Sequence, residues 1–145
     1  MILFSSEIEF VFTNKIKMNK LIIDAASEKI FLMIISNASI YNITHENTKI
    51  NYEKLTIIIN DFLLSKDIKI GDIDAIYINK GPGSFAGIRN SMSVVKAFNV
   101  AKKIDYYCYS LKDFKGEDDV RHENIPNLCK KYKIKKNLIN PVYLS

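Results

Sequence analysis

The residues best suited to chemistry lie in one glycine-rich stretch at positions 79–89, with the sequence NKGPGSFAGIR. It follows an apolar run typical of a strand and opens a long helical pattern. A turn that enters a helix exposes unpaired backbone N–H groups and the positive end of the helix dipole, so it can hold an anion or permit a close backbone contact. Gly81 and Gly83 allow unusual dihedral angles, Pro82 restricts the turn between them, and Ser84 is a good N-cap.

Two phosphate-binding motifs are excluded for this stretch. It lacks the Gly-Lys-Ser/Thr ending of a Walker loop, and its glycines miss the dinucleotide-binding spacing by one residue. Other chemical groups are scattered. His45 and His122 lack the close spacing of metal sites, and Ser84 has no evident His or acid partner. The residues alone therefore predict no catalytic constellation and no metal site, and a tight strand-to-helix turn is the simpler interpretation of such a loop.

The stretch nevertheless has a specific resemblance. Residues 81–89, GPGSFAGIR, resemble the GPGSFTG(L/V/I)R signature of the TsaB family, once called YeaZ, a subunit of the bacterial machinery that makes threonylcarbamoyladenosine in tRNA. Ala86 replaces the usual threonine, which keeps the turn but removes a hydroxyl. The resemblance covers 19–111 and extends to the ending at 140–144, whereas about thirty residues stand where the family has a second lobe. The signature residues carried over are Gly81, Pro82, Gly83, Ser84, Phe85, Gly87 and Arg89.

The residues alone define the fold class only as α/β, and the resemblance refines it to a single ribonuclease-H-like lobe of the actin-like ATPase superfamily. We expect this lobe at 18–111. Residues 1–17 would be an N-terminal extension or a misassigned start, and 112–145 a basic tail with a family-like C-terminal segment. The expected elements form a mixed sheet in the order β-β-β-α-β-α-β, with strands at 21–27, 29–35 and 39–44, a helix at 51–65, a strand at 72–79, a helix at 85–103 and a strand at 105–110.

Asp24 ends the first expected strand, where ATP- and metal-using members of that superfamily place a carboxylate. Two-metal nuclease chemistry needs further carboxylates that converge on it. Asp72 and Asp74 begin a neighbouring strand at the far end of the sheet and cannot supply them. A phosphotransferase would need a second lobe to close over its nucleotide. We therefore expect Asp24 to cap a strand-end turn.

Both expected helices are apolar over much of their circumference, which indicates burial on more than one side. The second cover is either another protein or the other helix of the pair. The resemblance favours the first, because TsaB pairs with itself and with TsaD through these helices. Glutamate at Val95 or Phe98 should then abolish pairing without unfolding the lobe. The predicted partner interface consists of Tyr52, Leu55, Ile59, Phe62, Ile88, Met92, Val95 and Phe98.

A lysine-rich run near the end of the sequence offers a second contact surface. It could bind tRNA phosphates, each of which adds salt-dependent affinity, although a solvated tail is the commoner meaning of such a run. The net charge of +5 does not decide between these two interpretations. The many lysines accompany many Ile and Asn residues, and an AT-rich genome encodes all three types in excess. Only Tyr132 interleaves the run, so base stacking is not indicated. The candidate tRNA contacts are Lys130, Lys131, Lys133, Lys135 and Lys136.

Length and composition agree with one domain, because 145 residues with 48% hydrophobic content can bury a substantial core. No apolar stretch is long enough to span a bilayer, and the first twenty residues lack the features of a signal peptide. We therefore expect a cytoplasmic protein. Cys108 and Cys129 are far apart and are predicted to be reduced structural thiols.

Together, the residues and the resemblance predict a non-catalytic scaffold subunit. It would bind and activate TsaD, and through it TsaE, for transfer of a threonylcarbamoyl group to N6 of the adenosine 3′ of the tRNA anticodon. ATP and metal would lie on the partner subunits, and this chain would carry no cofactor. One alternative is a degenerate nucleotide-binding phosphotransferase or hydrolase that uses Asp24 and the glycine loop, which ATP or metal binding by the isolated chain would reveal. Another is a homodimeric interaction module with no tRNA role, which would not co-purify with TsaD.

Overall fold

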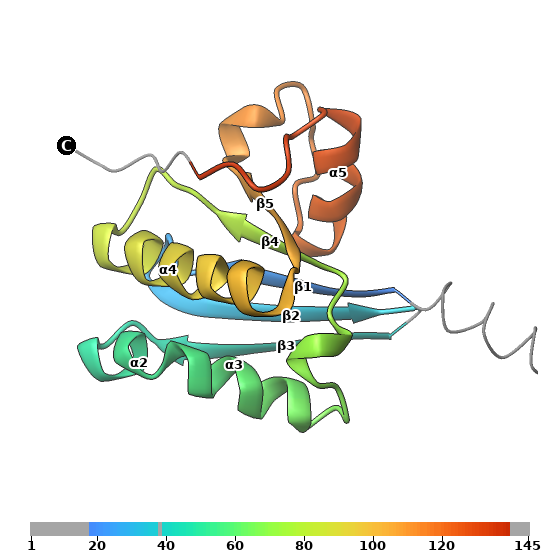
Figure 1. Cartoon of the computed structure of the whole chain (residues 1–145). Coiled ribbons are helices and arrows are strands. Elements are labelled where there is room, and N and C mark those ends of the chain that lie inside the picture. Colours follow the sequence, from blue (N-terminus) through green and yellow to red (C-terminus); the bar gives the residue numbers. More distant parts are fainter. Residues whose placement is uncertain (1–17, 38, 140–145) are drawn as a thin grey trace, which may run out of the picture.

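A single mixed sheet of five strands forms the centre of the computed structural model, which describes residues 18–37 and 39–139 (Figure 1). The strand order is β3-β2-β1-β4-β5. β1 pairs antiparallel with β2, and β2 antiparallel with β3, whereas β1, β4 and β5 are parallel neighbours. The predicted features at 1–17 and 140–144 lie outside the described residues. The strands are β1 (Asn19–Asp24), β2 (Lys29–Ser36), β3 (Ser39–Glu46), β4 (Ala75–Asn79) and β5 (Asp105–Tyr109).

Helices lie on both faces of this sheet. The expected helix at 51–65 is divided at Lys54 into α2 and α3, and the expected helix at 85–103 is α4. Among the described helices, none is both long and apolar enough to cross a membrane. The helices are α2 (Lys49–Glu53), α3 (Leu55–Leu64), α4 (Phe85–Lys102) and α5 (Ile125–Lys131), with short 3-10 turns η1 (Ile70–Asp72), η2 (Leu111–Asp113) and η3 (His122–Asn124).

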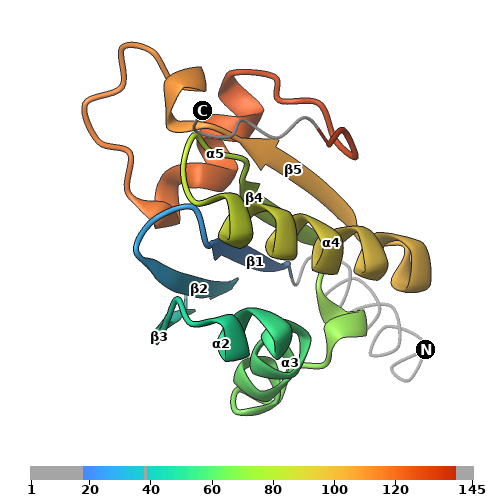
Figure 2. The ribbon, with the colours of Figure 1, turned by 90° about the vertical axis from the view of Figure 1, so that its left-hand side faces the viewer.

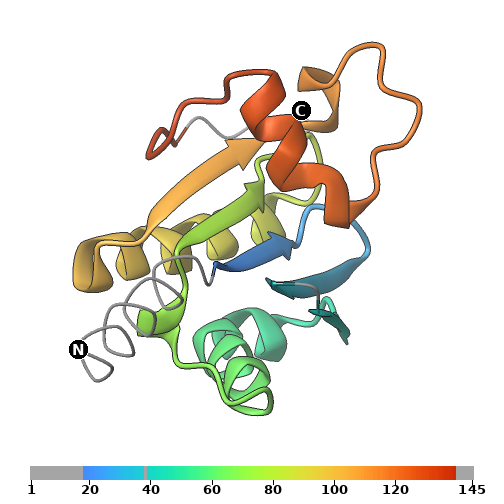
Figure 3. The same cartoon turned by 90° about the vertical axis from the view of Figure 1, so that its right-hand side faces the viewer.

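The first face of the sheet is covered by α2, α3 and α4. In Figure 2 α4 passes in front of β4, and in Figure 3, seen from the opposite side, it passes behind β4 and β5. Successive side chains of a strand point to opposite faces, so Leu21 and Ile23 of β1 pack into the core under these helices while Ile22 packs on the other side. All three side chains are fully buried. Because the middle of β1 is covered on both faces, residues 21–23 are a continuous apolar run, whereas the two ends of the strand are polar.

The second face is covered by α5 and the segments around it. Ile125, Leu128 and Cys129 of α5 pack against Ile22 and Tyr77 of the sheet. The cover continues past the helix, where the Asn137 N–H donates to the Tyr106 carbonyl at 2.7 Å. Residues 112–139 therefore pack on the sheet, while the lysines of the run at 130–136 remain exposed.

Candidate functional site

Polar side chains gather where the parallel strands β1 and β4 end. Asp24 closes β1 and is 7% exposed, and Asn79 closes β4 and is 6% exposed. The Asp24 Oδ1 atom accepts from the Ala26 N–H at 3.2 Å and from the Asn79 side-chain amide at 3.2 Å. Asp24 therefore holds the turn after β1, as the sequence predicts, and also joins β1 to β4.

His122 completes this cluster from the other side of the sheet. Its Nε2–H donates to Asp24 Oδ2 at 2.9 Å, and its ring stacks on Phe31 of β2 with centroids 4.0 Å apart. The Tyr109 hydroxyl is buried nearby and has no hydrogen-bond partner within the described residues. Burial and then the neighbouring Asp24 carboxylate raise the pKa of Tyr109, so its hydroxyl stays protonated. Sequence reasoning missed this contact because His122 and Asp24 are 98 positions apart and no local pattern connects them.

The arrangement around Asp24 is suited to anchoring rather than to proton transfer. Three donors occupy the carboxylate, and the imidazole that faces it lies flat against an aromatic ring. Asp74 lies at the opposite end of β1, where its Oδ2 accepts from the Asn19 N–H at 2.7 Å. That position agrees with the expectation that Asp74 cannot join Asp24. Across the described part of the chain, no three His, Cys, Asp or Glu side chains are grouped closely enough to hold a metal ion.

The glycine-rich loop uses much of its hydrogen-bonding capacity within the chain. Gly81 N–H donates to Asn79 Oδ1 at 2.9 Å, and Ser84 N–H donates to the Ala26 carbonyl at 2.9 Å. Ser84 then caps α4, because its Oγ accepts from the Gly87 N–H at 3.1 Å. Gly81 has φ 102°, in the region that favours glycine. Of the two roles that the sequence allows for this loop, close backbone contact is the one that the geometry favours.

Two glycines permit that contact. A Cβ atom on Gly83 would lie 2.2 Å from the Ala26 carbonyl oxygen, and one on Gly87 would lie 1.8 Å from the Ala25 carbonyl oxygen. The start of α4 therefore rests directly on the backbone that follows β1. Phe85 and Arg89 lie on the outer side of the same turn, with the Arg89 guanidinium 6.0 Å from the centre of the Phe85 ring. The signature thus positions α4 and presents an exposed aromatic residue, Phe85, at the start of that helix.

The predicted partner interface requires a correction. The chain buries all eight of these side chains in its own core, where they lie between the sheet and the helices and are at most 9% exposed. The physical reason is that α2, α3 and α4 contact one another as well as the sheet, so each helix has two covered sides within the chain. The residues concerned are Tyr52, Leu55, Ile59, Phe62, Ile88, Met92, Val95 and Phe98.

Different apolar residues remain on the outside of this helix layer. Ile57 and Leu64 of α3 are 58% and 56% exposed, and because they are seven positions apart they share one side of the helix. On α4, Val100 is 70% exposed, and Phe85 at the start of the helix is 55% exposed. A contact surface on α3 and α4 must therefore be built from these side chains.

The structure divides the lysine run into two groups. Lys131 forms an ion pair with Glu117, and Lys136 lies 3.5 Å from an Asp105 carboxylate oxygen. The contact with Lys131, together with a hydrogen bond from Tyr132, lowers the pKa of Glu117. Lys130, Lys133 and Lys135 are exposed and form no ion pair within the described residues.

Both cysteines are buried free thiols, as the sequence predicts. Burial raises the pKa of Cys108 to about 11 and that of Cys129 to about 12, with a smaller contribution from Asp113 to the shift of Cys129. A thiol rather than a thiolate is present at neutral pH, so neither cysteine is an activated nucleophile.

Comparisons with known proteins extend this picture. The family described as TsaD, tRNA N6-adenosine threonylcarbamoyltransferase, matches residues 45–110. The curated tRNA threonylcarbamoyladenosine biosynthesis protein TsaB of Buchnera aphidicola is 25% identical over 87 residues, which are 60% of this chain and 41% of that protein. The solved structure of YeaZ from Pseudomonas aeruginosa matches with a TM-score of 0.59 and 20% identity, over 64% of this chain and 44% of that one. The chain spans less than half the length of these relatives, and the structural likeness confirms the predicted α/β, ribonuclease-H-like fold.

Proposed function

Because the comparisons support membership of the TsaB (YeaZ) family, we propose that this chain is an accessory subunit in the synthesis of threonylcarbamoyladenosine in tRNA. In this role it binds and activates TsaD, which transfers the threonylcarbamoyl group to N6 of the adenosine 3′ of the anticodon. TsaE joins through TsaD, and ATP and metal are held by those partners. The chain acts by mass action, since binding the competent conformation of TsaD raises the population of that conformation.

One observation carries this proposal. The TsaD family match at 45–110 spans α2, α3, the signature loop and α4, the same layer on which apolar side chains remain exposed. Of the polar cluster, Asp24 and His122 lie outside that match and Asn79 lies within it, and the cluster is arranged as an internal anchor. A binding role for the helix layer is therefore better supported than chemistry at the strand ends.

The partner surface that we propose is centred on Ile57, Leu64 and Val100. Each is a large apolar side chain that is more than half exposed. Burying such a side chain against a partner contributes about 1.5 to 3 kcal/mol relative to leaving it in water. A homodimer through the same helices would use the same residues and would compete with TsaD for them.

Co-expression of the full chain with TsaD from the same genome, followed by size-exclusion chromatography with mass detection, tests the proposal. The wild-type chain should elute with TsaD, and Ile57→Glu, Leu64→Glu and Val100→Glu should each lose the complex while the circular dichroism spectrum stays unchanged. Asn127→Glu adds the same charge to an exposed position on the opposite face of the sheet and should leave the complex intact.

Two results would contradict the proposal. A wild-type chain that stays alone or only dimerises in the presence of TsaD would remove the proposed role. A complex that survives all three helix substitutions would place the contact elsewhere on the chain.

A further inference from the structure

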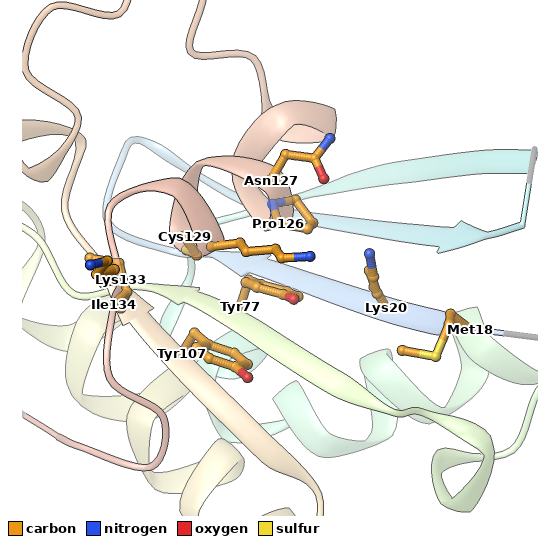
Figure 4. A pocket seen from close by; sticks show the side chains of 10 residues that line it. Met18, Lys20, Tyr77, Tyr107, Pro126, Asn127, Cys129, Lys133 and Ile134 are labelled. Atoms are coloured by element: carbon orange, nitrogen blue, oxygen red, sulfur yellow. The ribbon is translucent and has the colours of Figure 1, made fainter. Parts of the chain in front are cut away.

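A pocket of about 490 Å³ lies on the second face of the sheet, beside α5 (Figure 4). Its walls come from β1, β4, β5 and α5 and from the chain that follows α5. We propose that this pocket binds the phosphate group of a nucleotide, whether free or part of an RNA. This inference goes beyond the accessory role and does not depend on it, because no residue of the proposed partner surface lines the pocket.

Charge is the first argument. Lys20, Lys130 and Lys133 line the pocket, and among the residues that the structure describes no Asp or Glu does. Within residues 18–37 and 39–139, none of these three lysines forms an ion pair, whereas their neighbours Lys131 and Lys136 each have a carboxylate partner. Three lysines that line one concave site make its potential positive, and a positive potential attracts an anion.

The position of Lys20 on β1 fixes where one of these positive charges lies in the pocket. Side chains of β1 alternate, so Lys20 points to the same face as Ile22 and Asp24. Ile22 is covered by α5 and Asp24 by His122, which leaves Lys20 as the residue of that row that lines the pocket. Lys20 is also half-buried, so its charge acts in a medium that screens it less than bulk water does.

Two tyrosines supply hydrogen-bond donors. Tyr77 and Tyr107 pair across β4 and β5, and their rings stack with centroids 5.1 Å apart and an angle of 12° between the planes. In Figure 4 the Tyr77 hydroxyl points toward the side on which the Lys20 ammonium group lies. Burial and then the proximity of Tyr107 raise the pKa of Tyr77, so its hydroxyl keeps the proton that it would donate to a phosphate oxygen.

The size and the apolar part of the lining favour a nucleotide over a bare anion. Pockets that hold small ligands are typically about 300 to 1,000 Å³ in volume, which includes this one. Pro126 and Ile134 add apolar surface beside the lysines, against which a base or sugar can pack. A nucleoside diphosphate matches both parts of the site. Its phosphates carry a negative charge close in magnitude to the positive charge of the three lysines, and its base and sugar can pack on the apolar surface.

The site is separate from the polar cluster at the strand ends. Lys20 and Asp24 are four residues apart on one strand, which corresponds to about 13 Å. Substitution of Asp24 should therefore leave binding in the pocket unchanged. Binding should also proceed without a divalent metal, because ammonium and hydroxyl groups make the contacts.

Calorimetric titration of the full chain with ADP, in EDTA and at low salt, tests the inference. We expect saturable one-to-one binding that weakens as salt is raised. Lys20→Gln, Lys130→Gln and Lys133→Gln should each weaken it by about three- to tenfold, and the triple variant should abolish it. Lys135→Gln is the matched control, because Lys135 is an exposed lysine of the same run that does not line the pocket.

A parallel titration with tRNA distinguishes the two sources of phosphate. ADP binding that is lost in the triple variant identifies a free nucleotide site. If ADP does not bind, but the triple variant lowers tRNA affinity by more than tenfold while Lys135→Gln does not, the phosphate belongs to RNA. The inference is overturned if neither probe binds, if the triple variant binds like wild type, or if Lys135→Gln weakens binding as much as Lys133→Gln.

Discussion

Replacing Gly87 with alanine tests the role that the structure gives to the signature loop. Gly87 lies in the first turn of α4, directly over the backbone that follows β1. In an unobstructed helix the change from glycine to alanine stabilises by about 1 kcal/mol. Here the added Cβ would lie 1.8 Å from the Ala25 carbonyl oxygen and 2.9 Å from its carbon. The structure therefore predicts a change of the opposite sign.

The size of this destabilisation follows from how far α4 must move to accommodate the added Cβ atom. Separations under 3.0 Å are essentially never found for a Cβ atom, so α4 and the turn after β1 must part by about 1 Å or more. Overpacking of this kind costs about 1 to 3 kcal/mol, and the obstacle is backbone rather than a flexible side chain, which places Gly87 at the upper end. After subtraction of the helix-propensity gain, Gly87→Ala should lower the free energy of unfolding by about 2 kcal/mol.

Urea and thermal unfolding, followed by circular dichroism, measure this difference. A loss of that size should lower the melting temperature by about 8 °C in a domain of this length. Gly71→Ala is the control, because an added Cβ at that exposed glycine meets nothing within 4 Å, and it should be neutral or slightly stabilising. If Gly87→Ala proves as stable as Gly71→Ala, the close approach of α4 to the turn after β1 is wrong.

Three further predictions follow from the core and the anchor. His122→Ala removes both the hydrogen bond to Asp24 and the stack on Phe31. It should lower the free energy of unfolding in urea by about 1 to 2 kcal/mol. An unchanged urea midpoint would mean that His122 does not contact Asp24 in solution. Val95→Glu places a charge at a position that is 1% exposed and should unfold the chain, so a native circular dichroism spectrum for this variant would contradict the revised helix faces. The native pKa values of Cys108 and Cys129, about 11 and about 12, lie above the ordinary value of 9.0, so the native state holds these protons more tightly than the unfolded state. Their contribution to stability is complete below about pH 9 and is lost as pH rises through 11 to 12. Urea midpoints of the wild type should therefore fall more steeply over that range than those of a Cys108→Ala/Cys129→Ala variant.

Much of the sheet and the first helix layer could be predicted from the sequence. β1 and β2 are apolar runs separated by a polar turn, and α4 begins at the residue whose side chain caps it, Ser84. The division of the expected helix at Lys54 was not predicted, because neither glycine nor proline marks it. α5 was missed for a more instructive reason. Proline breaks the interior of a helix, but Pro126 lies in the first turn of α5, where a missing N–H leaves no hydrogen bond unmade.

The candidate sites were harder to predict because they depend on contacts between distant segments. Nothing near His122 in the sequence indicates that it reaches Asp24, and Lys20 and Lys133 belong to elements at opposite ends of the described chain. The prediction that these helix faces bind a partner was wrong for a related reason. The apolar pattern correctly showed that Val95 and Phe98 are covered, but a periodicity does not indicate whether the cover comes from the same chain or from another.

The cover on the second face of the sheet also has a consequence for the order in which the protein is made. β5 ends at Tyr109, whereas the side chains that cover Ile22 and Tyr77 come from a later segment, which runs from Phe114 to Ile134. Ribosomes add about 5 to 20 residues each second, so about 1 to 5 seconds separate the synthesis of Tyr109 from that of Ile134. During this interval one side of a twisted apolar sheet faces the solvent. A nascent chain stalled between these points is therefore the species on which we expect a chaperone to act.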